Sequence, residues 1–269
     1  MSNLSILRTY AQKPPSEFPS SVLFTHTERT LTIYDAYPKS TFHFLILPRV
    51  QSESEITLKD LHSLKTLLKC DKSHAKEVID ALAKDAEDVK KEIESEMVKR
   101  YGFKWQVVGA IVAALVFSST FRPIWTGFHA SPSMHHLHLH VLSADLCSEK
   151  LKHKKHYNSF HPKLGFFLHL EDVLGWFEAE PSYFTQMAKL DEKKYESLLK
   201  EGLTCFHCDK EMKNIPTLKE HLQSEWDAQA SKAKAREERK RKAEERKKDT
   251  DSDDVETATD EHQDKKQKS

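Results

Sequence analysis

Histidine and aliphatic residues alternate in the segment His136–Leu142, which reads HLHLHVL. Successive side chains of a β-strand point to opposite faces, so a strand here places His136, His138 and His140 on one face. The aliphatic residues between them then face a core. We therefore expect a sheet that is buried on one side and carries imidazoles on the other.

Three imidazoles on one strand face suit two kinds of site. Neutral imidazole is a common metal ligand, so the face is able to hold a metal ion. Alternatively, one imidazole is a nucleophile toward a phosphate while its neighbours donate hydrogen bonds to phosphate oxygens. A histidine-rich strand without a function is disfavoured, because five histidines fall within the twelve positions 129–140.

A second metal-ligand pattern lies near the C-terminus. Cys205 and Cys208 are separated by two residues, His221 follows after twelve more, and Glu225 after a further three. The first three positions have zinc-finger spacing, and a helix would put His221 and Glu225 one turn apart. Carboxylate is an accepted zinc ligand, so Glu225 is the expected fourth ligand, with His207 or water as the alternative. We predict one structural zinc ion here.

Strand and helix patterns surround the histidine segment. Thr57 is the expected N-cap of a first helix, which a polar break at 71–73 separates from a second. The predicted elements are strands over 22–24, 31–34 and 42–48, and helices within 57–100, 166–177 and 181–201.

The charges are balanced overall but unevenly distributed. Basic and acidic residues number 42 each, so the net charge indicates no partner. Residues 232–248 hold ten basic and four acidic side chains, and residues 249–260 are acidic. Such a basic block is typical of nuclear import and of non-specific attraction to DNA, and equally of a solubilising tail. Few apolar residues follow Asp227, so we expect disorder there, or helix only at its start.

One segment has an unusual composition. Residues 105–121 contain no charge over 17 positions, a little short of the ~20 residues that a membrane helix needs. The segment is interpreted as a buried core element, an apolar surface insertion or translated non-coding sequence. The four cysteines and the absence of a basic-then-apolar N-terminal signal indicate a reducing intracellular compartment.

The histidine segment resembles the signature of the histidine-triad (HIT) family of nucleotide hydrolases and transferases. The longer run Gly127–Val141, the basic segment Lys150–Phe160 and the finger pattern are similar to its aprataxin branch, which acts in DNA repair. The resemblance covers roughly residues 22–226 and is interrupted at 105–121.

This resemblance implies an α+β fold, in which a HIT-like antiparallel sheet with helices precedes a small ββα-type zinc finger. The expected parts are an N-terminal arm or short helix (1–20), a catalytic domain (21–180), a linker helix (181–200), the finger (201–228) and a disordered charged tail (229–269).

The resemblance also implies the removal of AMP from 5′-adenylated DNA ends. His138, the middle imidazole, is the expected nucleophile and would form a covalent adenylyl-histidine. The other expected catalytic residues are His136, His140, His129 and Lys155, and the expected substrate-binding residues are Asp35, Lys39, His43 and Ser133. The alternative interpretations are a half-buried strand histidine for His43, a solvated turn for Lys39 and a solvated loop for Lys155.

Two other functions stay open. One is a HIT hydrolase that acts on small adenylated molecules, and the other is a DNA-binding finger protein without catalytic activity. For the DNA hydrolase we expect a nuclear monomer that binds adenylated DNA, releases AMP, needs no catalytic metal and has no membrane partner.

Overall fold

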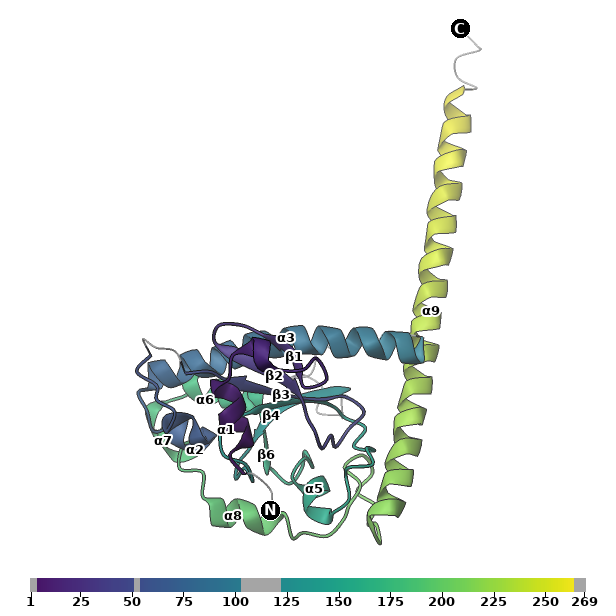
Figure 1. The fold of residues 1–269 in the computed structure, drawn as a ribbon. Coiled ribbons are helices and arrows are strands. Elements are labelled where there is room, and N and C mark those ends of the chain that lie inside the picture. Colours follow the sequence, from purple (N-terminus) through teal and green to yellow (C-terminus); the bar gives the residue numbers. More distant parts are fainter. Residues whose placement is uncertain (1–3, 51–53, 103–121, 264–269) are drawn as a thin grey trace.

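A single antiparallel sheet organises the first part of the chain. The computed structural model describes residues 4–50, 54–102 and 122–263, with side chains described as far as Arg246. The sheet has six strands in the order β1-β2-β3-β5-β4-β6, and every neighbouring pair is antiparallel (Figure 1). The strands are β1 (Leu23–His26), β2 (Thr30–Tyr34), β3 (His43–Pro48), β4 (Ile124–His129), β5 (Leu139–Ser143) and β6 (Phe167–His169). The predicted α+β class is confirmed.

Helices cover both faces of this sheet. The long helix α3 (Lys72–Tyr101) packs on one face, where Ile46 and Val141 join its buried side chains in one core. The short helix α1 (Ile6–Gln12) packs on the other, where its Leu7 meets Leu45. Residues that pair across strands share a face, and Leu45 pairs with His140, so the histidine face of β5 is the face that α1 covers.

The helix α3 follows directly from its sequence. Asp71 caps its N-terminus by accepting hydrogen bonds from the backbone N–H groups of Ser73 and His74. Gly102 ends the helix in the left-handed region, with φ of 74°. The buried side of α3 includes Ile79, Leu82, Ala86, Val89, Ile93 and Met97.

The predicted helix that begins at Thr57 is wrong. Thr57 instead closes a turn in which its backbone N–H and hydroxyl both donate to the Asp60 carboxylate. A short 3₁₀ turn, η2 (Asp60–His62), follows, and Ser63 caps the four-residue helix α2 (Leu64–Leu67). The turn competes with the helix because the side chains of Thr57 and Asp60 hydrogen-bond locally.

The segments after the histidine strand are more broken than expected. The helix predicted over 166–177 divides into strand β6, which pairs with β4, and helix α6 (Leu170–Glu178). The single linking helix expected over 181–201 is two short helices, α7 (Pro181–Met187) and α8 (Glu192–Leu198). A further short helix, α5 (Lys154–Asn158), and the turn η1 (Pro15–Glu17) complete the elements before the finger.

The zinc-finger region packs into the main core. Its predicted β-hairpin consists of one bridge pair, Thr204 and Glu211, and its helix is the start of α9 (Ile215–Gln263). Leu218, Leu222 and Trp226 are buried in the same hydrophobic cluster as α3 and the sheet. The finger is therefore joined to the sheet domain by a shared core.

The charged tail continues α9 further than we expected. Among the side chains of α9 described as far as Arg246, the last buried one is Ala230, and beyond it α9 projects away from the body (Figure 1). Ion pairs at i,i+4 spacing, Lys240–Glu244 and Arg241–Glu245, favour helix here without a hydrophobic face. Among the described residues no helix is long and apolar enough to cross a membrane. The uncharged segment 105–121 lies outside the described residues.

Candidate functional site

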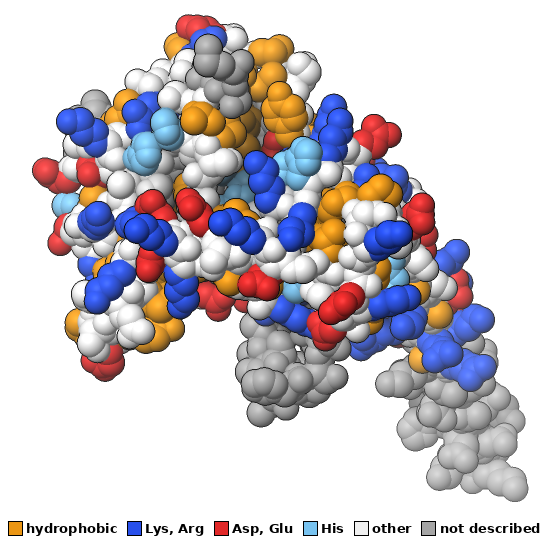
Figure 2. Space-filling model, turned by 90° about the horizontal axis from the view of Figure 1, so that it is seen from below, with side chains coloured by type: hydrophobic (Ala, Val, Ile, Leu, Met, Phe, Trp, Pro, Cys, Tyr) orange, Lys and Arg blue, Asp and Glu red, His pale blue; other side chains and the backbone are white. Residues whose placement is uncertain are grey.

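Three strand histidines, together with His138 just before β5, converge on the face of the sheet that α1 covers. The ring centroid of His140 lies 4.4 Å from that of His129, 4.9 Å from that of His138 and 5.2 Å from that of His43. They meet because β5 lies between β3 and β4 in the sheet. Histidine side chains reach the lower surface of the molecule, with Lys and Arg side chains around them (Figure 2).

The ring of His138 is held in one tautomer. Its Nδ1 lies 2.8 Å from the backbone carbonyl of His136, which can only accept, so Nδ1 carries the proton and Nε2 carries the lone pair. Burial lowers the pKa of His138, although the hydrogen bond to the carbonyl and the charge of Asp35 act to raise it. The imidazole is therefore neutral at pH 7, as a nitrogen nucleophile requires.

His136 itself does not lie on the imidazole face. Its φ is 94°, so the regular strand begins only at Leu139. Its Nε2 donates to the carbonyl of Pro48 at 2.8 Å, which turns the ring toward the end of β3. The expectation of three imidazoles on one face is wrong at this position, because the backbone turns there. The carbonyl of His136, rather than its ring, orients His138.

A hydrogen-bonded chain runs from the turn after β2 to His140. The backbone N–H of Lys39 donates to Nδ1 of His43 at 3.0 Å, so the proton of neutral His43 is on Nε2. That Nε2 donates to Nδ1 of His140 at 3.0 Å, which leaves the proton of His140 on its own Nε2. This last N–H is buried and has no partner in the described part of the chain. It is thus a donor available to a ligand oxygen.

Two charges border this chain. Oδ2 of Asp35 lies 3.4 Å from Nδ1 of His43, and Oδ1 of Asp35 accepts from the backbone of Tyr37. Burial lowers the pKa of Lys39, partly offset by Asp35, and the Lys39 amine bonds the carbonyl of Tyr37. The positive charge of Lys39 also lowers the pKa values of His43 and His140, so this charge acts directly on the imidazole cluster.

Burial decides the charge of the cluster as a whole. It is the largest cause of the lowered pKa of His43, which falls to about 4, and it holds the pKa values of His129 and His140 well below the ordinary range. Nε2 of His129 is also buried without a partner among the described residues. The cluster therefore offers neutral imidazole nitrogens to a ligand.

Two predicted site residues stay at the edge. Ser133 is exposed in the loop between β4 and β5. Lys155 is exposed on α5, where its charge acts on His156, the pKa of which burial, Lys39 and other neighbouring charges lower to about 4. The charges of Lys39 and Lys155 thus both act on His156.

Two residues that the sequence reasoning missed support the site. The ring of Phe160 contacts His43, His129 and His140 at centroid distances of 5.4, 4.6 and 5.2 Å. The buried carboxylate of Asp145 accepts from the backbone and hydroxyl of Thr41 and from the Ser143 hydroxyl, and this ties the turn before β3 to the end of β5. Burial raises the pKa of Asp145 against these bonds. An acidic residue directly after a buried strand was the available signal.

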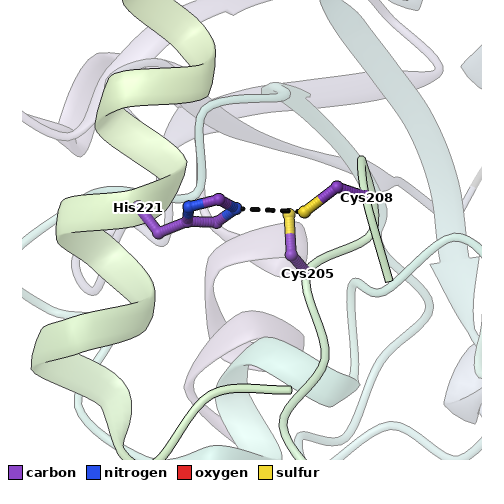
Figure 3. Close-up of side chains that lie close together, drawn as sticks. All are labelled: Cys205, Cys208 and His221. Carbon is purple, nitrogen blue, oxygen red and sulfur yellow. Dashed lines mark hydrogen bonds between the residues drawn. The ribbon is translucent and has the colours of Figure 1, made fainter. Parts of the chain in front are cut away.

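A metal-binding arrangement lies at the finger. Ligand atoms of Cys205, Cys208 and His221 all lie within 4.8 Å of one another (Figure 3). Sγ of Cys208 is 3.3 Å from Nε2 of His221, and Oε1 of Glu225 is 3.6 Å from the same nitrogen. Tetrahedral zinc with bonds of about 2.0–2.3 Å separates its ligand atoms by about 3.3–3.8 Å. The two cysteines and the histidine therefore fit zinc, while Glu225 lies beside His221 but outside this three-residue group. The ring of His207 packs at a tilt against Phe206, with the ring centroids 4.0 Å apart.

Two family models match the chain, one over the region of the histidine cluster and the other over the finger. Residues 9–156 match the family described as scavenger mRNA decapping enzyme C-term binding. Residues 163–228 match the C2HE / C2H2 / C2HC zinc-binding finger. The second match covers all four predicted zinc ligands, so the chain carries a zinc-binding finger.

Relatives and solved structures agree with this division. Aprataxin of Ciona intestinalis is 31% identical over 199 residues, covering 73% of this chain and 40% of that protein. An aprataxin-like protein of Saccharomyces cerevisiae is 27% identical over 240 residues, covering 82% of this chain and 95% of that protein. A crystal structure of the aprataxin ortholog Hnt3 in complex with DNA matches with a TM-score of 0.60 at 25% identity, over 86% of this chain and 98% of that one.

The coverage of these relatives is uneven. The chain spans 24% to 49% of the length of four animal relatives that it matches, three of which are named aprataxin. The first family model, in contrast, covers more than half of this chain. The chain therefore belongs to the family described by the scavenger mRNA decapping enzyme C-terminal model, and within that family it is aprataxin-like.

Proposed function

We propose that this protein is a DNA-repair hydrolase that removes AMP from 5′-adenylated DNA ends. The observation that carries the proposal is the tautomer of His138, whose Nε2 lone pair faces a site built from further imidazoles. An aprataxin ortholog of the same fold has been solved in complex with DNA, which supports DNA as the substrate class. The proposed activity is that of a phosphoanhydride hydrolase.

In the proposed first step, Nε2 of His138 attacks the phosphorus of AMP. The new N–P bond replaces the P–O bond to the bridging oxygen, and the 5′-phosphate of the DNA leaves with that electron pair. The Nε2–H of His140 and the charge of Lys39 are suited to neutralise phosphate oxygens as attack proceeds. In this proposal His129, Ser133 and Lys155 contact the phosphates, and Asp35 contacts the ribose hydroxyls.

In the second step, water attacks the adenylyl-histidine. The N–P bond breaks, its electron pair returns to Nε2 of His138, and AMP leaves with the oxygen and one proton of the water, while the second proton passes to solvent. Throughout both steps the proton stays on Nδ1 of His138 and is donated to the His136 carbonyl, which stabilises any positive charge on the ring. His136 and His43 act as positioning residues in this scheme.

We assign a structural role to the zinc-binding finger. One zinc ion held by Cys205, Cys208, His221 and Glu225 would fix the start of α9 beside the catalytic domain. We further propose a nuclear monomer, with residues 232–248 as the import signal. We expect an intact fluorescent fusion to enter the nucleus and a fusion that lacks this segment to be excluded from it.

The test is AMP release from a 5′-adenylated nicked duplex. We expect His138→Ala to abolish release and His26→Ala, which alters an exposed histidine of edge strand β1, to retain it. Substrate labelled in its AMP should leave label on the wild-type protein after denaturation and none on His138→Ala. If folded, zinc-loaded wild type releases no AMP, the proposed enzymatic activity is refuted. If it releases AMP equally well from small adenylated molecules, a generic HIT hydrolase is favoured instead.

A further inference from the structure

The charges of α9 are unevenly distributed around the helix axis between residues 232 and 246. With about 100° of rotation per residue, Lys232, Arg236, Arg239 and Arg246 fall within a strip about 80° wide. We call these four residues the basic stripe. The opposite side carries all four acidic residues of the stretch together with two basic ones: Glu237, Glu238, Glu244, Glu245, Lys234 and Arg241. The stripe side of the helix therefore carries positive charge without acidic residues.

The side chains of the basic stripe are exposed to solvent. The helix carries eight basic and four acidic residues between positions 231 and 246, a net charge of +4. The core residues Leu218, Leu222 and Trp226 belong to the first part of α9, and the stripe lies on the part of the helix that projects from the body beyond Ala230 (Figure 1). The stripe side chains are therefore open to a ligand.

The chemistry of the stripe suits a polyanion rather than a protein surface. Protein interfaces depend on buried aromatic or aliphatic anchors, and the residues on the stripe side between the basic ones are the small Ala235 and Ala243. Unpaired nucleic-acid bases require aromatic side chains for stacking, and this helical stretch contains none. Phosphates of a duplex require only positive charge at the right spacing.

We propose that the basic stripe of α9 binds the phosphate backbone of duplex DNA beyond the lesion; this rests on the proposed function for the identity of the DNA. The helix rises 1.5 Å per residue, so the stripe ends about 38 Å along α9 from the zinc ligand His221. At 3.4 Å per base pair this length corresponds to about eleven base pairs of duplex. Short duplexes would therefore end before the far part of the stripe.

The test compares two matched double variants. R236Q/R239Q removes two charges from the stripe, and K234Q/R241Q removes two from the other side of the same helix. Both have the same net charge, and glutamine preserves helix propensity. Binding to an unadenylated nicked duplex is measured by fluorescence anisotropy between 50 and 200 mM salt, with 8 or 24 base pairs on each side of the nick. Circular dichroism checks that both variants keep the helix.

We expect R236Q/R239Q to lower the slope of log affinity against log salt by about 2 on the long duplex. Its affinity would then fall about twelvefold less than that of wild type over this salt range. K234Q/R241Q should keep the wild-type slope, and the short duplex should give all three proteins similar slopes.

Equal slopes for the two variants on the long duplex would overturn the proposal, because net charge alone would then explain binding. The same loss on single-stranded DNA of equal length would also overturn it. The binding assay needs no turnover, so it is independent of the proposed hydrolysis. AMP release by wild type from an adenylated nick tests that function separately.

Discussion

The Tyr157 hydroxyl joins the catalytic domain to the finger, and its removal should destabilise both. The hydroxyl donates to the carbonyl of Thr204 at 2.8 Å and accepts from the backbone N–H of Phe206 at 3.2 Å. Tyr157 is fully buried, and Phe206 is 8% exposed. Tyr157→Phe keeps the ring and deletes the one atom that satisfies both backbone groups.

The cost follows from the two groups left without a partner. A buried donor or acceptor that loses its partner costs about 1–3 kcal/mol. The Phe206 N–H is the more buried of the two groups, and water can reach the Thr204 carbonyl more easily, since Thr204 is only half-buried. We therefore expect Tyr157→Phe to lower the free energy of unfolding by about 2–4 kcal/mol.

The assay is urea unfolding of the zinc-loaded protein followed by tryptophan fluorescence. Trp226 of α9 and Trp125 of β4 are both buried, so the signal reports on finger and sheet together. Tyr183→Phe is the matched control, because Tyr183 is 47% exposed on α7. A change below about 0.5 kcal/mol for Tyr157→Phe, equal to the control, would refute the reasoning, since surface substitutions have effects of that size.

The remaining predictions concern protonation, charge and metal. Activity should persist below pH 6.5, because burial lowers the pKa of His138 and keeps it neutral; loss of kcat with an apparent pKa above 6.5 would contradict this. The pKa of His43 is about 4 in the fold and 6.5 in the unfolded chain, so the unfolded chain takes up the proton more readily. The free energy of unfolding is therefore unaffected by His43 above pH 6.5 and decreases as pH falls toward 4. At pH 5.5 this loss is about 1.4 kcal/mol, measurable by urea unfolding of wild type and His43→Gln. Lys39→Gln should reduce kcat by 10²-fold or more with Lys39→Arg retaining more activity, as single-turnover AMP release would show. A strong zinc chelator should release the metal and lower the melting temperature of wild type and leave that of Cys208→Ala unchanged.

Much of the fold was predictable because its signals are local. Strand-type residue patterns predicted β2 and β3, and helical spacing after the polar break at 71–73 predicted α3. The prediction at Thr57 was wrong because a side-chain turn with Asp60 competes with the helix over a few residues. The local sequence pattern does not distinguish the helix from the turn, because both provide hydrogen-bond partners for the same backbone groups.

The candidate site was predictable in its membership but not in its geometry. His138, His140, His43 and His129 come together, yet His136 turns away at a positive φ that no alternation indicates. The role of its carbonyl was equally hidden, since any residue offers the same group. Only the placement of the loop against Pro48 and His62 decides which carbonyl meets His138.

The sequence by itself determined the spacing of the zinc ligands, the strand alternation and the order of the parts, because each depends on neighbours in the chain. The tertiary structure alone decided which nitrogen of each imidazole carries the proton. His43 and His140 are 97 positions apart, and their hydrogen bond exists only because β3 pairs with β5. Burial against Phe160 and the neighbouring rings then keeps the imidazoles neutral, and burial is a property of packing that no single segment contains.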